Sequence, residues 1–369
     1  MARRKRLVFV PRLMDEANMN PQSKNAQAIL GRWGGDRAVC RTLCYNEPDP
    51  LVAANTFVRV HRLLRRHLWY VDAILKFQRR ADLVFYADAH WTHRAGLAVR
   101  KLTGRKVPLI GTAEGFAGDA AREEKLSEWA GHRVYCQYVP PEGLASLDRF
   151  SRDADHIIAI SPFIARMQER LYGEKVSYLP LGIDSPIFHD KPTEKNRRLT
   201  VIGCGRLYAN KRPDVFIELA SRYTDVDFSW YGWGELLEPL RARAEDLKLN
   251  NLSYPGPVKN TELADAFRKA HLFILPSRSE GVPKVTQEAA ACGLPQVIFG
   301  FYEAYSVVDG QNGYVVWDDE GFYERVDQLL ANPGLREDMG RIGAEMAKAW
   351  SWDILAPQWQ STILRFLPD

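Results

Sequence analysis

The chain has 369 residues, enough for two domains with separate buried cores, and its 46% hydrophobic and 26% charged residues are ordinary for a folded protein. No apolar run approaches the roughly 20 residues that span a bilayer, so the sequence predicts no transmembrane helix. The net charge of +4 is unevenly divided, because residues 1–110 hold 21 Lys and Arg against 8 Asp and Glu, leaving −9 for the remainder. This excess predicts an anionic partner for the amino-terminal part, with nucleic acid and an anionic membrane surface as candidates.

The amino terminus is basic over residues 1–6, like the start of a signal peptide, but Pro11 and Arg12 interrupt the apolar run that follows. We interpret this segment as the approach to a first strand. The cysteines are scattered and odd in number, which predicts reduced thiols rather than a disulfide framework or a metal cluster. We therefore expect a cytoplasmic protein, with peripheral attachment to the inner face of the membrane as an open alternative.

Short apolar runs alternate with helical stretches along the chain, which is the pattern of parallel sheets with helices on both faces. In the first half we expect strands at Leu7–Val10, Leu83–Tyr86, Pro108–Thr112 and His156–Ile160. In the second half we expect them at Leu199–Gly203, Asp227–Tyr231, Leu252–Pro255, Leu272–Leu275 and Pro295–Phe299. A turn-rich, charged stretch separates the two series, and we place a hinge at 185–198.

A basic helix is expected from Val60 to Arg80, where apolar residues recur at helical spacing and most of the Arg and Lys residues lie off that stripe. Two interpretations stay open. The helix packs on a sheet with its basic face in solvent, or the basic face contacts anionic lipid or a lipid-linked acceptor.

The most informative segment runs from Leu275 to Gly293, where an apolar strand leads into a polar loop and then a helix start. Pro283 suits the first position of that helix and Gly293 suits its end. Ligands bind beyond the carboxyl ends of strands in open α/β sheets, and a helix amino terminus offers free amides to a diphosphate. Glu280 and Glu288 are separated carboxylates, each able to accept hydrogen bonds from neighbouring sugar hydroxyls.

The spacing of these two glutamates, with Pro276-Ser277, Gly281 and Gly293-Leu-Pro around them, resembles the signature of retaining glycosyltransferases of family 4. The resemblance implies the GT-B fold, which consists of two Rossmann-like domains facing a cleft. It also implies that Glu280 binds the transferred sugar and Glu288 the ribose. The loop and helix-start residues that would face the diphosphate are Gly281, Val282, Pro283 and Lys284.

A second segment, Val201–Pro213, is a strand followed by a glycine-flanked turn and two cations. Gly205 allows a close backbone approach, and Arg206 with Lys211 would neutralise a diphosphate. Taken alone, such a segment is also typical of an ordinary basic surface turn. It is similar to the family's Gly-Arg-Leu segment, which implies that Arg206 and Lys211 hold the donor pyrophosphate.

Further positions follow from the same resemblance. Backbone near Val258 is expected to contact the nucleobase. Residues 349–353 resemble the start of a terminal helix that crosses back onto the first domain, so the expected divisions are 1–185 for the acceptor domain, 186–350 for the donor domain and 351–369 for the helix.

The loop after the first strand lacks the glycines that many relatives carry. Asn20 or Ser23 is expected to cap the next helix, with Asn25 near the phosphates.

Glu114 stands where relatives often have histidine, and it either binds an acceptor hydroxyl or the sugar, or caps a helix. His90 and His93 lie three residues apart beside Trp91. A pair without a third ligand is a weak metal signal, so we expect histidines in a loop or on a helix surface and no metal site.

The sequence thus predicts a glycosyltransferase that moves a sugar from a nucleoside diphosphate sugar to an acceptor hydroxyl with retention, in polysaccharide or glycolipid synthesis. The expected partners are the donor, a sugar, glycan or lipid-linked acceptor, and an anionic membrane surface; no metal, cofactor or nucleic acid is expected. Two alternatives remain: a GT-B sugar-nucleotide epimerase or phosphorylase, and a nucleic-acid-binding protein, for which no motif is present.

Overall fold

The structure is a computed structural model, and it describes residues 5–13, 21–34, 38–44, 54–55, 57–60, 81–87 and 93–368. The chain divides into two compact units. Unit 1 comprises Met1–Asp119, Gln137–Gly182 and Trp352–Asp369, and unit 2 comprises Ala120–Cys136 and Ile183–Ser351. No helix in the described part of the chain is both long and apolar enough to cross a membrane.

Unit 1 is built on a seven-stranded sheet in the order β3-β2-β1-β4-β5-β8-β9, in which every neighbouring pair is parallel. The strands are β1 (Lys5–Leu13), β2 (Ala38–Cys44), β3 (Phe57–Val60), β4 (Leu83–Tyr86), β5 (Leu109–Ala113), β8 (His156–Ala159) and β9 (Val176–Tyr178). A separate small sheet pairs β6 (Ala117–Gly118) with β7 (Gln137–Tyr138). Parallel pairing requires crossovers, and described helices lie in the connections from β1 to β2, β4 to β5, β5 to β8 and β8 to β9.

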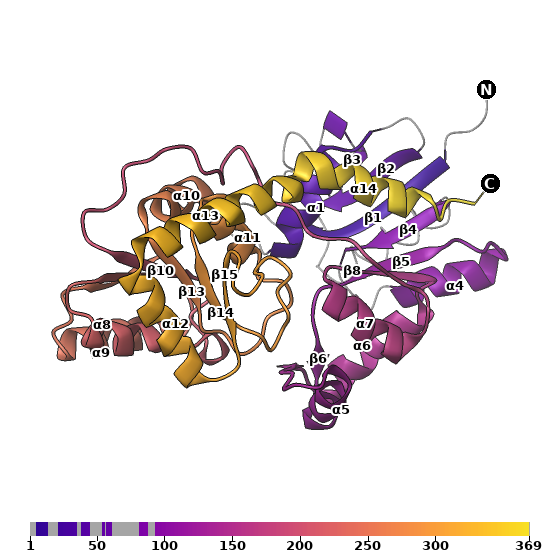
Figure 1. The fold of residues 1–369 in the computed structure, drawn as a ribbon. Coiled ribbons are helices and arrows are strands. Elements are labelled where there is room, and N and C mark those ends of the chain that lie inside the picture. Colours follow the sequence, from indigo (N-terminus) through magenta and orange to yellow (C-terminus); the bar gives the residue numbers. More distant parts are fainter. Residues whose placement is uncertain are drawn as a thin grey trace. The chain divides into compact units, whose positions relative to one another are not determined.

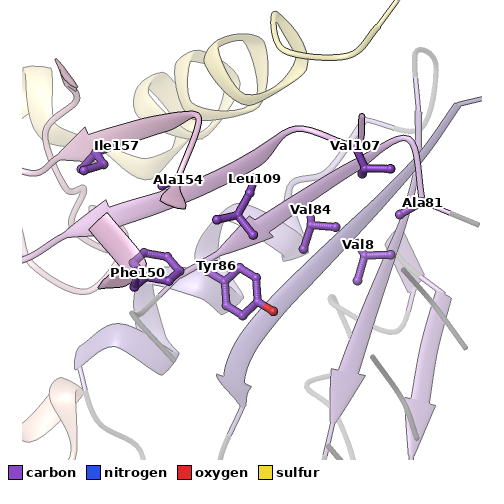
Figure 2. Packing of buried hydrophobic residues seen from close by; sticks show 9 residues of the cluster. All are labelled: Val8, Ala81, Val84, Tyr86, Val107, Leu109, Phe150, Ala154 and Ile157. Atoms are coloured by element: carbon purple, nitrogen blue, oxygen red, sulfur yellow. The ribbon is translucent and has the colours of Figure 1, made fainter. Parts of the chain in front are cut away.

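The helices of unit 1 are α1 (Pro21–Gly31), α4 (His93–Thr103), α6 (Pro141–Asp153), α7 (Pro162–Tyr172) and α14 (Trp352–Leu364). Figure 2 shows Tyr86 of β4 and Phe150 of α6 among the buried aliphatic side chains of the core, and their rings meet edge to face at 5.6 Å. Removing a ring such as that of Phe150 from water contributes about 2 kcal/mol. The core therefore holds α6 on the sheet.

Helix α14 returns to unit 1 after the chain has passed through unit 2, and it packs on α1 (Figure 1). The Gln360 side chain donates to the carbonyls of Ile29 and Arg32, and Arg32 pairs with Asp353 at 2.8 Å. These contacts confirm the predicted terminal helix that crosses back onto the first domain.

Unit 2 has a six-stranded parallel sheet in the order β12-β11-β10-β13-β14-β15. Its strands are β10 (Thr200–Cys204), β11 (Asp227–Tyr231), β12 (Leu252–Gly256), β13 (Leu272–Leu275), β14 (Gln296–Phe299) and β15 (Gly313–Val316). Its helices are α5 (Ala120–Ala130), α8 (Val215–Arg222), α9 (Leu237–Asp246), α10 (Asn260–Lys269), α11 (Lys284–Ala291), α12 (Asp319–Ala331) and α13 (Pro333–Ala347). Helix α8 packs on β11 and α9 on β12. Helix α12 packs on β14 and β15 (Figure 1).

All nine predicted strands are present, and those at Leu83–Tyr86, Asp227–Tyr231 and Leu272–Leu275 match residue for residue. The strands β2, β3, β6, β7, β9 and β15 were not predicted. One expectation is corrected: Val60 ends strand β3 rather than opening the basic helix, and the rest of that expected helix, residues 61–80, lies outside the described residues.

Candidate active site

The centre of the unit 2 sheet is a point where the strand order reverses. Strands β10 and β13 are neighbours there, with Val201 opposite Leu272, although β11 and β12 come between them in the chain. From β10 the chain continues to β11 on one side, and from β13 it continues to β14 on the other. Ligands of open α/β sheets bind beyond the carboxyl ends of strands at such a switch point. Both predicted donor-binding segments begin at these two strand ends.

The loops after β10 and β13 are joined by hydrogen bonds and by an ion pair. The Arg278 amide donates to the Asn210 carbonyl at 2.9 Å, and Lys211 Nζ donates to the Glu280 carboxylate. The side chains of Lys211 and Glu280 are only 18% and 9% exposed, so water screens their attraction weakly. Two residues predicted separately, as a phosphate ligand and a sugar ligand, therefore lie in direct contact.

The next residue, Arg212, contacts α12 rather than Glu280. It adopts a left-handed backbone conformation with φ of 51°, pairs with Asp319 at the start of α12, and lies over the Phe299 ring. Burial lowers the pKa of Arg212, but the hydrogen bonds that it donates to the Asp319 carboxylate, together with that negative charge, outweigh burial and raise the pKa above its ordinary value. Of the two adjacent cations, Lys211 is thus the one at the predicted site, and Arg212 attaches the loop to α12.

Arg206, the other cation of the predicted diphosphate clamp, follows Gly205 at the end of β10 and is exposed. Gly205 has φ of 155°, and its carbonyl accepts a hydrogen bond from the Trp230 indole at 3.1 Å. The guanidinium lies over the rings of Tyr208 and Trp233.

Helix α11 begins one residue later than expected, at Lys284, with Pro283 at the preceding cap position. Its start is anchored by Thr286, whose hydroxyl lies 2.6 Å from both the Pro283 carbonyl and the Ser306 hydroxyl. Glu288 lies in the second turn and is half-buried. Gly293 follows the helix with φ of 74°, as expected for its end. The described structure thus provides the strand, loop and helix start that the sequence predicts.

Tyr302 was not identified from the sequence. It is 2% exposed, and burial together with the negative charge of Glu280 raises its pKa well above the ordinary value. Its hydroxyl therefore stays protonated in the environment of Glu280. No local pattern signals this, because Tyr302 follows β14 and approaches Glu280 only in the folded sheet.

The other predicted site residues are distributed over both units. Val258 is half-buried between β12 and α10 in unit 2. In unit 1, Glu114 directly follows β5 and is half-buried, and Asn25 is 4% exposed within α1. The expected capping role of Ser23 is wrong, because Ser23 lies inside α1, and Asn20 lies outside the described residues.

The expectation that His93 lies in a loop or on a helix surface is wrong. Its side chain is fully buried at the start of α4, 3.0 Å from an Asp153 carboxylate oxygen and against the Phe150 ring. His90 lies outside the described residues. No group of three candidate metal ligands occurs among the residues whose side chains are described.

A cavity of about 270 Å³ lies elsewhere in unit 2, on the face of the sheet rather than at its carboxyl edge. Its lining includes Thr200 of β10, Tyr231 of β11 and Asp265 of α10, and none of the predicted donor-site residues. Asp265 is already paired with Lys269 at 2.7 Å, and this interaction lowers its pKa. We therefore place the candidate site at the strand ends.

The sequence also matches two models of known protein families. Residues 184–346 match the family described as glycosyl transferases group 1, and residues 37–185 match glycosyltransferase family 4. The chain belongs to family 4 of the glycosyltransferases.

Two curated relatives of this family 4 chain are similar over part of their length. D-inositol 3-phosphate glycosyltransferase of Paenarthrobacter aurescens is 29% identical, over 70% of this chain and 66% of its own. Alpha-galactosylglucosyldiacylglycerol synthase of Streptococcus pneumoniae is 25% identical, over 57% of this chain and 61% of its own. This chain thus spans somewhat less than two thirds of each relative.

Solved structures confirm the GT-B fold. Sucrose-phosphate synthase from Thermosynechococcus elongatus superposes with a TM-score of 0.77 at 15% identity, covering 98% of this chain and 99% of its own. Anabaena HepE in complex with UDP and glucose superposes with a TM-score of 0.74 at 14% identity, covering 98% and 100%. At these identities the likeness concerns the fold alone.

Proposed function

We propose that this protein transfers a sugar from a nucleoside diphosphate sugar to an acceptor hydroxyl, with retention at the anomeric carbon. The proposal rests on one observation: Glu280 and Lys211 meet at the switch point of the unit 2 sheet, beside the start of α11. A carboxylate suits sugar hydroxyls and an ammonium suits a phosphate, so the pair matches the junction between the two halves of such a donor.

The proposed chemistry needs stabilisation of charge on the leaving diphosphate. Arg206, Lys211 and the backbone N–H groups of Gly281, Val282 and Lys284 supply it, and such stabilisation is commonly the largest part of an enzymatic rate enhancement. The leaving phosphate itself takes the proton of the attacking hydroxyl, so neither a metal ion nor another cofactor is required. Glu280 binds the sugar and Glu288 the ribose.

The acceptor side is assigned to unit 1. Glu114, which follows β5, is proposed to bind an acceptor hydroxyl, and Asn25 to approach the phosphates. The names of two relatives, an inositol phosphate glycosyltransferase and a glycolipid synthase, support a glycolipid or polysaccharide product. The positive charge of residues 1–110 supports docking at an anionic membrane, where a lipid-linked acceptor would lie.

Thermal unfolding with UDP-, GDP- and ADP-linked sugars tests the donor assignment, because a bound ligand raises the midpoint by mass action. UDP-glucose is the first choice, since HepE was solved with UDP and glucose. We expect one of these donors to stabilise the protein and to be consumed faster with an acceptor than alone. Conversion of the donor at the same rate without acceptor would instead indicate an epimerase.

The variant Glu280→Gln tests the site. We expect it to lower transfer by about 100-fold, which corresponds to about 2.7 kcal/mol of transition-state stabilisation. The matched control is Glu324→Gln, which removes an exposed carboxylate from α12 of the same unit and is expected to retain transfer. Wild-type transfer by Glu280→Gln, or no stabilisation by any of the donors, would refute the proposal.

A further inference from the structure

The two cations of the proposed clamp are held in different ways. Lys211 has a carboxylate partner in Glu280. For Arg206, the contacts within the described residues are with aromatic rings: its Cζ lies 5.6 Å from the Trp233 ring centroid and 6.0 Å from that of Tyr208. Trp233 lies on the loop that follows β11, and β11 is the neighbour of β10 in the sheet.

The loop that carries Trp233 is fixed against the segment that carries Arg206. The Leu207 amide donates to the Trp233 carbonyl at 2.9 Å, which continues the pairing of the two strands beyond their ends. A Cβ on Gly232 would lie 1.9 Å from the Gly205 carbonyl oxygen, and one on Gly234 would lie 2.5 Å from a backbone oxygen. Only glycines allow this approach, so the backbones beneath Trp233 and Arg206 are held in one arrangement.

A ring face suits a guanidinium that must remain available to a ligand. The π system attracts the cation from one side, while the N–H groups project in the guanidinium plane and remain free to donate. A carboxylate partner would instead occupy two of those N–H groups in a bidentate pair. Trp233 is 54% exposed, so burial of its indole in a core does not account for its presence.

We propose that Trp233 is a positioning residue, which holds the Arg206 guanidinium by a cation–π contact with its N–H groups available to the donor diphosphate. The inference rests on the proposed function, because it takes the diphosphate as the ligand of Arg206. The indole of Trp233 acts on the donor only through Arg206 and does not contact the nucleotide itself. Trp233 should therefore matter for the diphosphate and much less for the nucleoside.

The test compares Trp233→Phe with Trp233→Leu. Both replacements shorten the side chain and keep it apolar, but only Phe retains a ring face. Arg206→Ala and the double variant that combines Trp233→Leu with Arg206→Ala complete a double-mutant cycle. Calorimetry measures the affinities for UDP, GDP and ADP and for their monophosphates, and the unfolding midpoint of each variant reports whether it is folded.

We expect Trp233→Leu to weaken binding of the preferred diphosphate about five-fold and of its monophosphate less than two-fold, while Trp233→Phe stays within about two-fold for both. The double variant should bind no more weakly than Arg206→Ala alone, because the indole acts only through the guanidinium. Equal losses for Phe and Leu, equal losses for mono- and diphosphate, or losses that multiply in the double variant would each overturn the inference while the proposed function stands. If the wild-type protein binds no nucleoside diphosphate, the proposed function fails and this inference fails with it.

Discussion

Replacing Glu280 with Gln is expected to change stability, nucleotide affinity and turnover in different directions. The substitution removes the charge that neutralises Lys211 while nearly preserving the side-chain shape. Two charges about 4 Å apart attract by about 4 kcal/mol at an effective dielectric of about 20. Because the two side chains are 18% and 9% exposed and a Gln oxygen still accepts a hydrogen bond, we expect a net loss of about 2 kcal/mol in the free energy of unfolding.

A bound diphosphate would supply the missing negative charge beside Lys211. The affinity of Glu280→Gln for the free nucleoside diphosphate, which carries no sugar, is therefore expected to rise by about 1 kcal/mol, or roughly five-fold, even as sugar transfer falls. The stability lost without nucleotide should be partly restored at saturating nucleotide.

Urea unfolding with and without the nucleoside diphosphate measures the first effect, and calorimetry measures the second. Lys211→Gln provides the opposite perturbation and should weaken diphosphate binding. Glu324→Gln controls for the loss of one negative charge from unit 2. Weaker diphosphate binding by Glu280→Gln, or an unchanged free energy of unfolding, would refute the reasoning that Glu280 and the diphosphate share Lys211.

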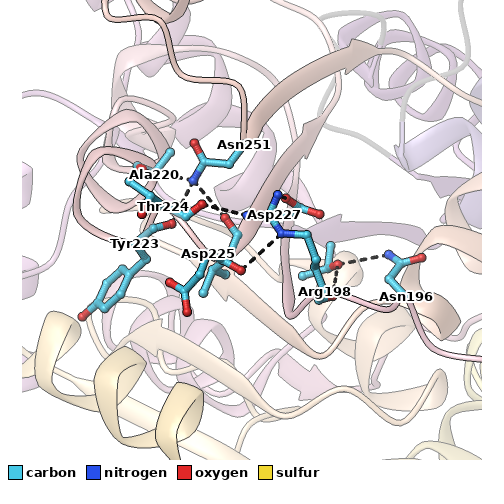
Figure 3. Close-up of polar contacts among 10 residues, drawn as sticks. Asn196, Arg198, Ala220, Tyr223, Thr224, Asp225, Asp227 and Asn251 are labelled. Atoms are coloured by element: carbon cyan, nitrogen blue, oxygen red, sulfur yellow. Dashed lines mark hydrogen bonds and ion pairs between the residues drawn. The ribbon is translucent and has the colours of Figure 1, made fainter.

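Three further predictions concern unit 2. Burial lowers the pKa of His271 to about 4, and Lys195 and Arg336 add to the effect, so the unfolded state binds more protons than the folded state between pH 4 and 6.5. The free energy of unfolding should therefore be highest above pH 6.5 and fall by about 1 kcal/mol towards pH 4, after allowance for solvent screening. In urea titrations, His271→Asn should flatten that decline. Asn251 Nδ2 donates to three backbone carbonyls at 2.8–3.1 Å (Figure 3), so Asn251→Ala should cost about 2–3 kcal/mol in urea unfolding, and a loss below about 0.5 kcal/mol would contradict this. Gly232→Ala places a Cβ 1.9 Å from a backbone oxygen, so it should cost several kcal/mol and weaken diphosphate binding, as the unfolding midpoint and calorimetry would show.

The sequence predicts the strands best where burial leaves a regular apolar pattern, either continuous as in β13 or alternating as in β11. Strand β13 is buried at every position and reads as an unbroken apolar run, Leu-Phe-Ile-Leu, so its bounds were predicted residue for residue. Strand β2 lies nearer the edge of its sheet and includes Arg41 and Thr42, so no apolar run marks it. The same limit applies to Val60, whose helical spacing with later residues did not prevent it from pairing in β3. Tertiary pairing overrides local pattern in such segments.

Single polar residues are harder to interpret than strands. His93 was expected in a loop or on a helix surface because a pair with His90 lacks a third metal ligand, but the structure buries it against Asp153. These two residues are 60 positions apart, and only the packing of α4 against α6 brings them together. The sequence contains no local signal for a partner at that separation, so burial of a lone titratable residue could not be predicted.

At the candidate site, local sequence motifs show which residues are present, but the contacts between those residues depend on segments that are distant in the sequence. The motifs identify Arg206, Lys211 and Glu280 by their spacing within two segments, but the reversal of strand order between β10 and β13 decides that Lys211 contacts Glu280. The pairing of β10 with β11 similarly decides that Arg206 contacts a ring. In the proposed reaction the diphosphate must therefore compete with Glu280 for Lys211, whereas it meets no competing carboxylate at Arg206 among the described residues. Replacing Trp233 with Leu should therefore weaken diphosphate binding, whereas replacing Glu280 with Gln should strengthen it, although neither residue is expected to bind the diphosphate directly.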